Sequence, residues 1–230
     1  MKAMILAAGR GERMRPLTDT RPKPLLEAGG KPLVGWIIEA LVNAGFRELV
    51  INVSHLGAQI ESALGSGARW GAQIEYSREA EPLETAGGIA TALPLLGSGV
   101  FIVVNADIHT DFDFARLRGV LRDDDERLAH LVLVDNPAHH PAGDFALQCG
   151  AVTNAGSARL TFSGIGAYRP ALFHGIAPHT RAQLAALLRP QIDAGRVTGE
   201  LHAGHWSDVG TPARLASIDR AIRGALTAGR

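Results

Sequence analysis

The sequence predicts an α/β fold in which three layers, α/β/α, are built around a mixed, mostly parallel central sheet. Two observations predict it. Short apolar runs of strand length alternate with helical patterns over the first hundred residues, and this alternation is typical of right-handed βαβ units. No Ser/Gly linker, low-complexity tract or internal repeat divides the 230 residues, so residues 1–230 are expected to form a single domain.

The first half contains the clearest elements. The run AMILA over residues 3–7 is stopped by Gly9, which suits a buried parallel strand, and a loop rich in Gly, Pro and charge follows over residues 8–30. A helix is expected from Pro32, a favoured first-turn residue, to Gly45, because apolar side chains recur between them at helical spacing. Similar patterns predict strands over residues 49–53, 72–76 and 101–105, and helices over residues 56–64 and 88–96.

The second half has a less regular pattern. The run HLVLV predicts a strand over residues 130–134, and a turn-rich loop follows over residues 136–144. The remaining patterns predict a strand over residues 160–168, helices over residues 181–194 and 211–226, and an extended segment over residues 197–202.

Composition excludes several classes of partner. The 23 Lys and Arg residues balance the 23 Asp and Glu residues, so no bulk field attracts nucleic acid or an anionic membrane. The single cysteine, Cys149, cannot form an internal disulfide, which fits a reducing compartment. The N-terminal apolar run is too short for a secretory signal, and no stretch approaches the roughly 20 apolar residues of a membrane span. We therefore expect a cytoplasmic protein.

The strongest motif follows the first strand. In the segment AAGRGERMRPLT, Gly9 and Gly11 allow backbone N–H groups to approach phosphate oxygens closely. The planar fork of Arg13 can grip a polyphosphate, while Lys23 offers a compact charge to a neighbouring phosphate. The prolines on either side of Lys23 restrict its direction of approach. These features together predict a phosphate-binding loop.

Two other interpretations of this loop are possible. A GxG after a strand can open a dinucleotide-binding fold, but that fingerprint needs a third small residue where Met14 stands, and a helix that starts at once. Here Pro16 keeps the segment a loop, and no Walker-type GK[ST] occurs. The second alternative, a solvated basic turn, does not explain why glycines, cations and prolines occur together. Phosphate binding is the favoured interpretation.

Two aspartates are candidate metal ligands. Asp107 follows the apolar run over residues 101–105, at the sheet edge where open α/β sheets bind ligands. Asp208 lies in the loop before the last helix. One carboxylate from each half could hold Mg²⁺, which prefers a few carboxylates with substrate phosphates and water. The alternative for Asp107 is a turn former or a helix cap.

These motifs resemble those of sugar-1-phosphate nucleotidyltransferases, whose signature is GxGxRLxPLT…PKP. Here Glu12 and Met14 stand where Thr and Leu are commoner. The resemblance extends through ETAGG (84–88), NAD (105–107) and WSDVGTP (206–212), so it covers nearly the whole chain. The segments NPAHHPAGDF (136–145) and TFSGIGAY (161–168) look most like the N-acetylmuramate-1-phosphate uridylyltransferases of cell-wall recycling.

The resemblance implies a Rossmann-like fold of the nucleotide-diphospho-sugar transferase type. It implies that Asp107 and Asp208 bind Mg²⁺, that Arg13 stabilises the leaving pyrophosphate, and that Lys23 lies near the α-phosphate and the incoming phosphate. Residues 1–110 would form the nucleotide-binding half and residues 111–230 the sugar-binding half. The expected nucleotide-binding residues are Leu6, Ala7, Gly9, Gly11, Glu12, Arg13, Lys23, Glu81, Gly87 and Asn105.

The expected substrates are UTP and N-acetylmuramic acid 1-phosphate, with pyrophosphate released. Gly143 and Asp144 are candidate sugar contacts, and the Glu-Lys-Pro sugar motif of many relatives is missing. The adjacent His139 and His140 lack the spacing of a zinc site. Three alternatives stay open: a guanylyltransferase for mannose 1-phosphate or a heptose phosphate, a non-catalytic nucleotide-binding subunit, and a dehydrogenase.

Overall fold

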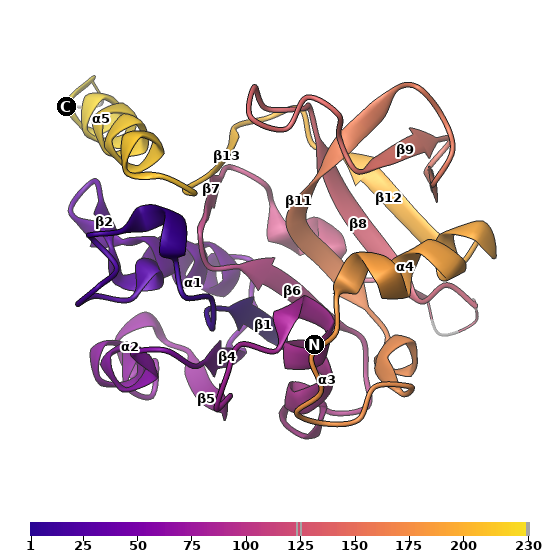
Figure 1. The fold of residues 1–230 in the computed structure, drawn as a ribbon, viewed down its shortest axis with the longest axis horizontal. Helices are drawn as coiled ribbons and strands as arrows, with labels where there is room; N and C mark the ends of the chain where they lie inside the picture. Colours follow the sequence, from indigo (N-terminus) through magenta and orange to yellow (C-terminus); the bar gives the residue numbers. More distant parts are fainter. Residues whose placement is uncertain (123, 125, 229–230) are drawn as a thin grey trace.

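One nine-stranded sheet runs through both halves of the chain in the computed structural model, which describes residues 1–122, 124 and 126–228 (Figure 1). The first half contributes four strands whose pairings are all parallel. They are β1 (Ala3–Leu6), β4 (Glu48–Val53), β5 (Gln73–Arg78) and β6 (Phe101–Asn105), in the spatial order β5-β4-β1-β6. All four coincide with expected strands to within two residues at each end, because each is a continuous apolar run or a clear alternation.

The second half extends the same sheet. It adds β8 (Ala129–Val134), β9 (Phe145–Gln148), β10 (Ala151–Thr153), β11 (Arg159–Tyr168) and β12 (Val197–Leu201). The order beyond β6 is β11-β8-β12-β10-β9, and only the β8–β12 pairing there is parallel. The expected mixed sheet is confirmed, with its parallel part concentrated in the first half. The short strands β9 and β10 were not expected. Their residues show no clear alternation of apolar and polar side chains, and only their hydrogen-bonded pairing identifies them as strands.

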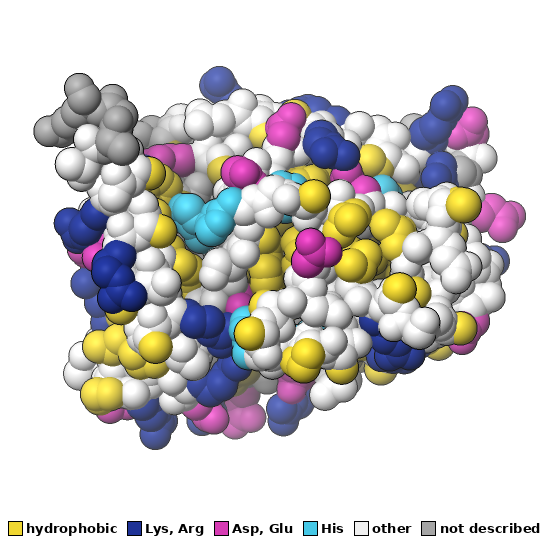
Figure 2. Space-filling model, turned by 90° about the horizontal axis from the view of Figure 1, so that it is seen from above, with side chains coloured by type: hydrophobic (Ala, Val, Ile, Leu, Met, Phe, Trp, Pro, Cys, Tyr) yellow, Lys and Arg dark blue, Asp and Glu magenta, His cyan; other side chains and the backbone are white. Residues whose placement is uncertain are grey.

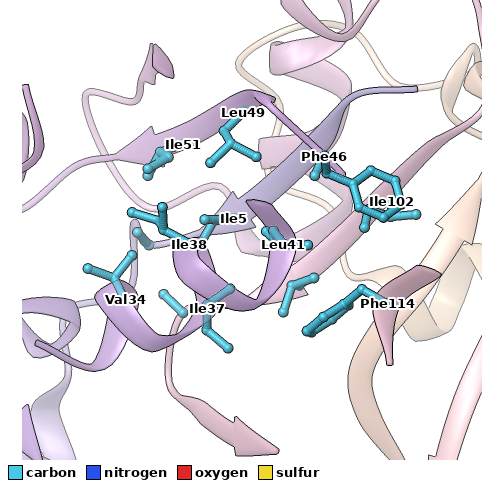
Figure 3. Close-up of a cluster of buried hydrophobic side chains, with 14 of the residues drawn as sticks. Ile5, Val34, Ile37, Ile38, Leu41, Phe46, Leu49, Ile51, Ile102 and Phe114 are labelled. Carbon is cyan, nitrogen blue, oxygen red and sulfur yellow. The ribbon is translucent and has the colours of Figure 1, made fainter. Parts of the chain in front are cut away.

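Helices cover both faces of the sheet, which confirms the three layers. On one face lie α1 (Leu33–Asn43) and α2 (Gly57–Leu64); on the other lie α3 (Glu84–Leu96) and α4 (Leu184–Asp193). Figure 3 shows the first face, where one side of α1 packs on the strands through Val34, Ile37, Ile38 and Leu41, against Ile5, Leu49 and Ile51. Fully burying each such side chain contributes about 1.5–3 kcal/mol.

The last helix, α5 (Pro212–Ala228), lies at the edge of the molecule and away from the sheet (Figure 1). Its apolar side packs on the two-residue strand β2 (Glu27–Ala28) and on the loop after β1. This third, smaller cluster contains Met14, Leu26, Ala28, Leu33, Val209, Leu215, Ile218 and Ile222. Within the described residues, no helix combines the length and apolar character that a membrane span requires.

The start of α3 differs from the sequence expectation. The helix begins at Glu84, four residues before the expected start, because the backbone N–H groups of Ala86 and Gly87 donate to the carbonyl oxygen of Ala182 (3.0 and 3.2 Å). Ala182 in turn donates its N–H to the Leu83 carbonyl oxygen over 3.0 Å, so residues 181–183 are extended and α4 begins only at Leu184. These caps come from a segment almost a hundred residues away, which no local pattern reveals.

Candidate active site

A cavity of about 810 Å³ opens where β1, β4, β5 and β6 end at their carboxyl termini. This is the edge at which open α/β sheets bind ligands, and the volume is that of a nucleotide-sized site. The lining residues come from the loop after β1, the segment between β5 and α3, and the end of β6. They include ten of the expected site residues, namely Leu6, Ala7, Gly9, Gly11, Glu12, Arg13, Lys23, Glu81, Asn105 and Asp107.

The loop after β1 is held in a fixed shape. Gly11 is in the left-handed region with φ 66°, and a Cβ there would lie 2.9 Å from Cγ2 of the buried Thr18. The Thr18 hydroxyl donates to the Gly11 carbonyl oxygen over 2.9 Å. Met14 is fully buried in the α5 cluster and anchors the loop, while Glu12 and Arg13 line the cavity. The buried side of this loop therefore needs an apolar residue at position 14.

Lys23 lies at the start of a short 3-10 turn, Lys23–Leu25, directly after the extended Pro22. Its Nζ atom forms an ion pair with Oδ2 of Asp107. The lysine side chain is only 13% exposed, against 29% for Asp107. Because both are partly shielded from water, this pair is stronger than a surface salt bridge. The structure thus brings the expected phosphate-binding lysine and an expected metal ligand together.

Asp107 and Asp208 are brought together by a two-stranded sheet that the sequence pattern did not indicate. In it β7 (Ile108–Thr110) pairs with β13 (Trp206–Asp208), with Asp208 opposite Ile108. The N–H of Val209 donates to the Asp107 carbonyl oxygen over 2.7 Å. Asp208 itself does not line the cavity, but Gly210 does. The two aspartates therefore lie on adjacent segments, of which the first lines the cavity through Asp107 and the second through Gly210.

Basic side chains also lie against Asp208. Its Oδ1 accepts a hydrogen bond from Nη1 of Arg214 at 2.5 Å and lies 3.0 Å from Nε2 of His139. His139 comes from the loop over residues 136–144. Only the tertiary structure therefore brings it next to Asp208, a candidate metal ligand. Arg214 was not expected to take part, because its position on α5 is a surface position in the sequence pattern.

The donor set fits a magnesium ion. Within the described part of the chain, no hydrogen bond occupies Oδ1 of Asp107 or Oδ2 of Asp208, so each carboxylate has an oxygen to offer a cation. The described residues contain no group of three acidic, histidine or cysteine side chains that could hold a metal ion. Mg²⁺ commonly binds through one or two carboxylates plus phosphate oxygens and water, and two carboxylates suffice for that.

The opposite wall of the cavity is formed by residues 81–85, between β5 and α3. Glu84 has a left-handed backbone (φ 60°), which is uncommon for this residue type and is found mainly at functional sites. Its carboxylate accepts a hydrogen bond from Nη2 of Arg181 over 2.7 Å, and both residues line the cavity. Arg181 was missed at the sequence level, because nothing local connects it to the first half.

Three expected contact residues do not line the cavity. Gly87 is buried, and a Cβ there would lie 2.2 Å from the Thr180 carbonyl oxygen, so its lack of a side chain serves the packing of α3 on that segment. Asp144 accepts a hydrogen bond from the Phe162 backbone over 2.8 Å, and Gly143 has a left-handed φ of 60° in the same turn. Contact of these three with substrate stays a prediction.

The sequence of this chain matches a family model. Residues 2–145, more than half of the chain, match the model described as nucleotidyl transferase. The chain belongs to the nucleotidyl transferase family. The loop after β1 and the ion pair between Lys23 and Asp107 both lie within the matched part of this nucleotidyl transferase.

Curated relatives of the nucleotidyl transferase include two that match it over nearly their full lengths. The N-acetylmuramate alpha-1-phosphate uridylyltransferase of Neisseria meningitidis is 54% identical over 98% of this chain and 99% of its own length. The protein of the same name from Caulobacter vibrioides is 34% identical over 95% and 96%. The mannose-1-phosphate guanylyltransferase catalytic subunit beta of Drosophila melanogaster is 43% identical over 50% of this chain and 32% of its own length.

Solved structures confirm the fold of the nucleotidyl transferase. A putative glucose-1-phosphate thymidylyltransferase from Bacillus anthracis, in complex with a sucrose, superposes with a TM-score of 0.86 over 97% of this chain and 95% of its own. HddC from Yersinia pseudotuberculosis, complexed with GMP-PN, superposes with a TM-score of 0.79 over 96% and 98%. Each is 20% identical in sequence to this chain, so the likeness concerns architecture alone.

Proposed function

We propose that this nucleotidyl transferase transfers UMP from UTP to N-acetylmuramic acid 1-phosphate and releases pyrophosphate. The single observation that carries the chemistry is the gathering of Arg13, Lys23 and Asp107 around one cavity, with Asp208 beside Asp107. The choice of substrates is supported by the two relatives that match over nearly their full lengths, since both bear the name of that uridylyltransferase. The mannose-1-phosphate guanylyltransferases either match only about half of the chain or match more of it at a lower sequence identity than these two relatives.

The reaction needs no general base. A phosphate monoester has a second pKa near 6, so the sugar phosphate is mostly ionised at neutral pH. The barrier arises from bringing two polyanions together for an in-line attack on the α-phosphorus, and positioning with charge neutralisation lowers it. Arg13 would bind the departing pyrophosphate, and Lys23 would neutralise the α-phosphate and the incoming phosphate. Mg²⁺, held by Asp107 and Asp208, would supply further charge neutralisation at the phosphates.

The two halves of the chain bind different parts of the substrates in this proposal. The base of UTP would lie between residues 6–9 and the segment that contains Glu81, Gly87 being buried behind that segment. Residues 1–110 would thus bind the nucleotide, and residues 111–230 the sugar through the turn at Gly143 and Asp144. We place the enzyme in the cytoplasm, in peptidoglycan recycling, because its proposed substrates are a nucleoside triphosphate and a cell-wall amino sugar.

A substrate panel tests the proposal. Purified protein is incubated with MgCl₂, with UTP, GTP or dTTP, and with the 1-phosphates of N-acetylmuramic acid, N-acetylglucosamine, glucose and mannose. Pyrophosphate release is expected to show its highest kcat/KM with UTP and N-acetylmuramic acid 1-phosphate. Preference for GTP and mannose 1-phosphate identifies a guanylyltransferase instead. Nucleotide binding without turnover in any combination identifies a non-catalytic subunit, and quenching of NADH fluorescence supports a dehydrogenase.

A further inference from the structure

Two buried polar side chains join the walls of the cavity. Asn52, near the end of β4, is 3% exposed, and Glu79, the residue after β5, is 5% exposed. Nδ2 of Asn52 donates a hydrogen bond to Oε1 of Glu79 over 2.7 Å. Burying a carboxylate and an amide is costly unless both are hydrogen-bonded, so the bridge needs further partners to persist.

Those partners are the two walls themselves. The backbone N–H of Ala7 donates to Oδ1 of Asn52 over 2.8 Å, and the N–H of Leu83 donates to Oε2 of Glu79 over 3.0 Å. These three hydrogen bonds form a series from Ala7 through Asn52 and Glu79 to Leu83. Because each backbone N–H must face an oxygen, the orientation of the Asn52 amide is determined, and its NH₂ group must donate to Glu79. Burial raises the pKa of Glu79, and its hydrogen bonds from Asn52 and Leu83 oppose that rise.

Helix α3 prevents the bridge from moving sideways. A Cβ at Gly88 would lie 2.7 Å from Oε1 of Glu79 and 2.9 Å from Nδ2 of Asn52, so the helix backbone is already in close contact with both atoms. The bridge is therefore confined between the sheet and α3, and it sets the distance between residues 6–9 and residues 81–85.

We propose that Asn52 and Glu79 are positioning residues for the planar base of the bound nucleoside triphosphate. Their bridge fixes the width of the slot that the base enters, and it removes the N–H groups of Ala7 and Leu83 from base recognition. This inference rests on the proposed function, which places the base between these two walls. Both residues line the cavity. In this proposal neither carries out a chemical step, and both act through the backbone they hold.

The donor–acceptor pattern allows a test by exchange. In the Asn52→Asp variant, the new carboxylate at position 52 faces the carboxylate of Glu79. In the Glu79→Gln variant, the NH₂ group of the new amide faces another N–H donor. In the double variant N52D/E79Q, the new carboxylate at position 52 accepts from the Ala7 N–H and from the new amide at position 79. The oxygen of that amide accepts from the Leu83 N–H, so every bond is restored. Each single variant is expected to weaken UTP binding about tenfold or more, and the double variant to recover to within about threefold.

Isothermal titration with UTP and with inorganic tripolyphosphate, together with thermal unfolding, separates positioning from folding. Tripolyphosphate contacts only the phosphate loop, so its affinity should stay constant in all variants. Asn154→Ala serves as the control, because Asn154 likewise links two elements, through Arg189 and Asp193, far from the cavity. Equal losses for both ligands, or no recovery in the double variant, overturn the proposal. If wild-type protein prefers another triphosphate, the uridylyl assignment fails, and the same cycle with that nucleotide still decides the role of the bridge.

Discussion

The ammonium group of Lys23 pairs with the carboxylate of Asp107, although 84 residues separate them along the chain. The lysine follows the loop after β1, and the aspartate lies two residues after the end of β6, so the ion pair joins two segments that line the cavity. In a bound complex the two charges would divide their roles, the lysine facing phosphate and the aspartate facing the metal. On the face shown in Figure 2, Lys and Arg side chains are interspersed with Asp and Glu.

Replacing Lys23 by Ala is expected to reduce the rate of pyrophosphate release by about 10²–10³-fold, because one preorganised charge at the reacting phosphate is lost. The melting temperature should change little. Lys2→Ala is the matched control, since Lys2 is also a partly buried lysine paired with a carboxylate, that of Glu75, at the opposite end of β1. A Lys23→Ala enzyme with the wild-type rate would exclude the role given to this residue.

Removing divalent cations with EDTA is expected to abolish pyrophosphate release, and added MgCl₂ should restore it. Asp208→Asn should raise the Mg²⁺ concentration at half-maximal rate about tenfold or more, because one of two carboxylate ligands is lost. Arg214→Gln should give a smaller increase, since Arg214 orients Asp208. Binding of Mn²⁺ in the presence of UTP, followed by electron paramagnetic resonance, measures the same effect without turnover.

Asp219→Asn is the control for the metal experiments. Asp219 pairs with Arg223 on α5 and accepts from the Gly29 backbone, away from Asp107 and Asp208. Its replacement should leave the Mg²⁺ dependence unchanged. Full activity of wild-type protein in EDTA would contradict the assignment of Asp107 and Asp208 as metal ligands.

Gly87→Ala is expected to lower the free energy of unfolding by about 1–3 kcal/mol, because the new methyl group would overlap the Thr180 carbonyl oxygen. Urea denaturation measures this change. Gly99→Ala is the control, since a Cβ there meets nothing within 4 Å. Unchanged stability together with weaker UTP binding would instead support the direct contact with the base that the family resemblance implies.

His130 makes stability depend on pH. It lies on β8 with Nδ1 2.9 Å from the Thr198 hydroxyl, and burial lowers its pKa below the ordinary 6.5, although Glu200 acts in the opposite direction. Below pH 6.5 the unfolded chain therefore binds more protons than the folded one, and the folded state loses stability as pH falls. His130→Gln should reduce the fall in melting temperature as the pH is lowered below 6.5. An exposed-site change, His174→Gln, should leave the pH dependence as in wild type, and identical slopes in wild type and His130→Gln would refute the prediction.

The sequence alone determined the main strands of the first half of the fold and most of the residues that line the cavity. Strands β1, β4 and β6 are mostly apolar runs. The loop after β1 combines glycines, cations and prolines, and phosphate binding is the one function that explains all three. These signals are local, since periodicity and turn chemistry depend on residues a few positions apart. The sequence contains one further signal for the cavity: Asn52 is a polar residue in the otherwise apolar run LVINV at the carboxyl end of a strand.

The tertiary structure decided everything that depends on segments far apart in the chain. It placed Asp208 beside Asp107 through the pairing of β7 with β13, brought His139 and Arg214 onto Asp208, and capped α3 with the carbonyl group of Ala182. It also showed packing and turn contacts for Gly87 and Asp144, whose contact with substrate stays a prediction. The physical reason is the same in each case: a hydrogen bond or ion pair between distant residues leaves no trace in the pattern around either partner.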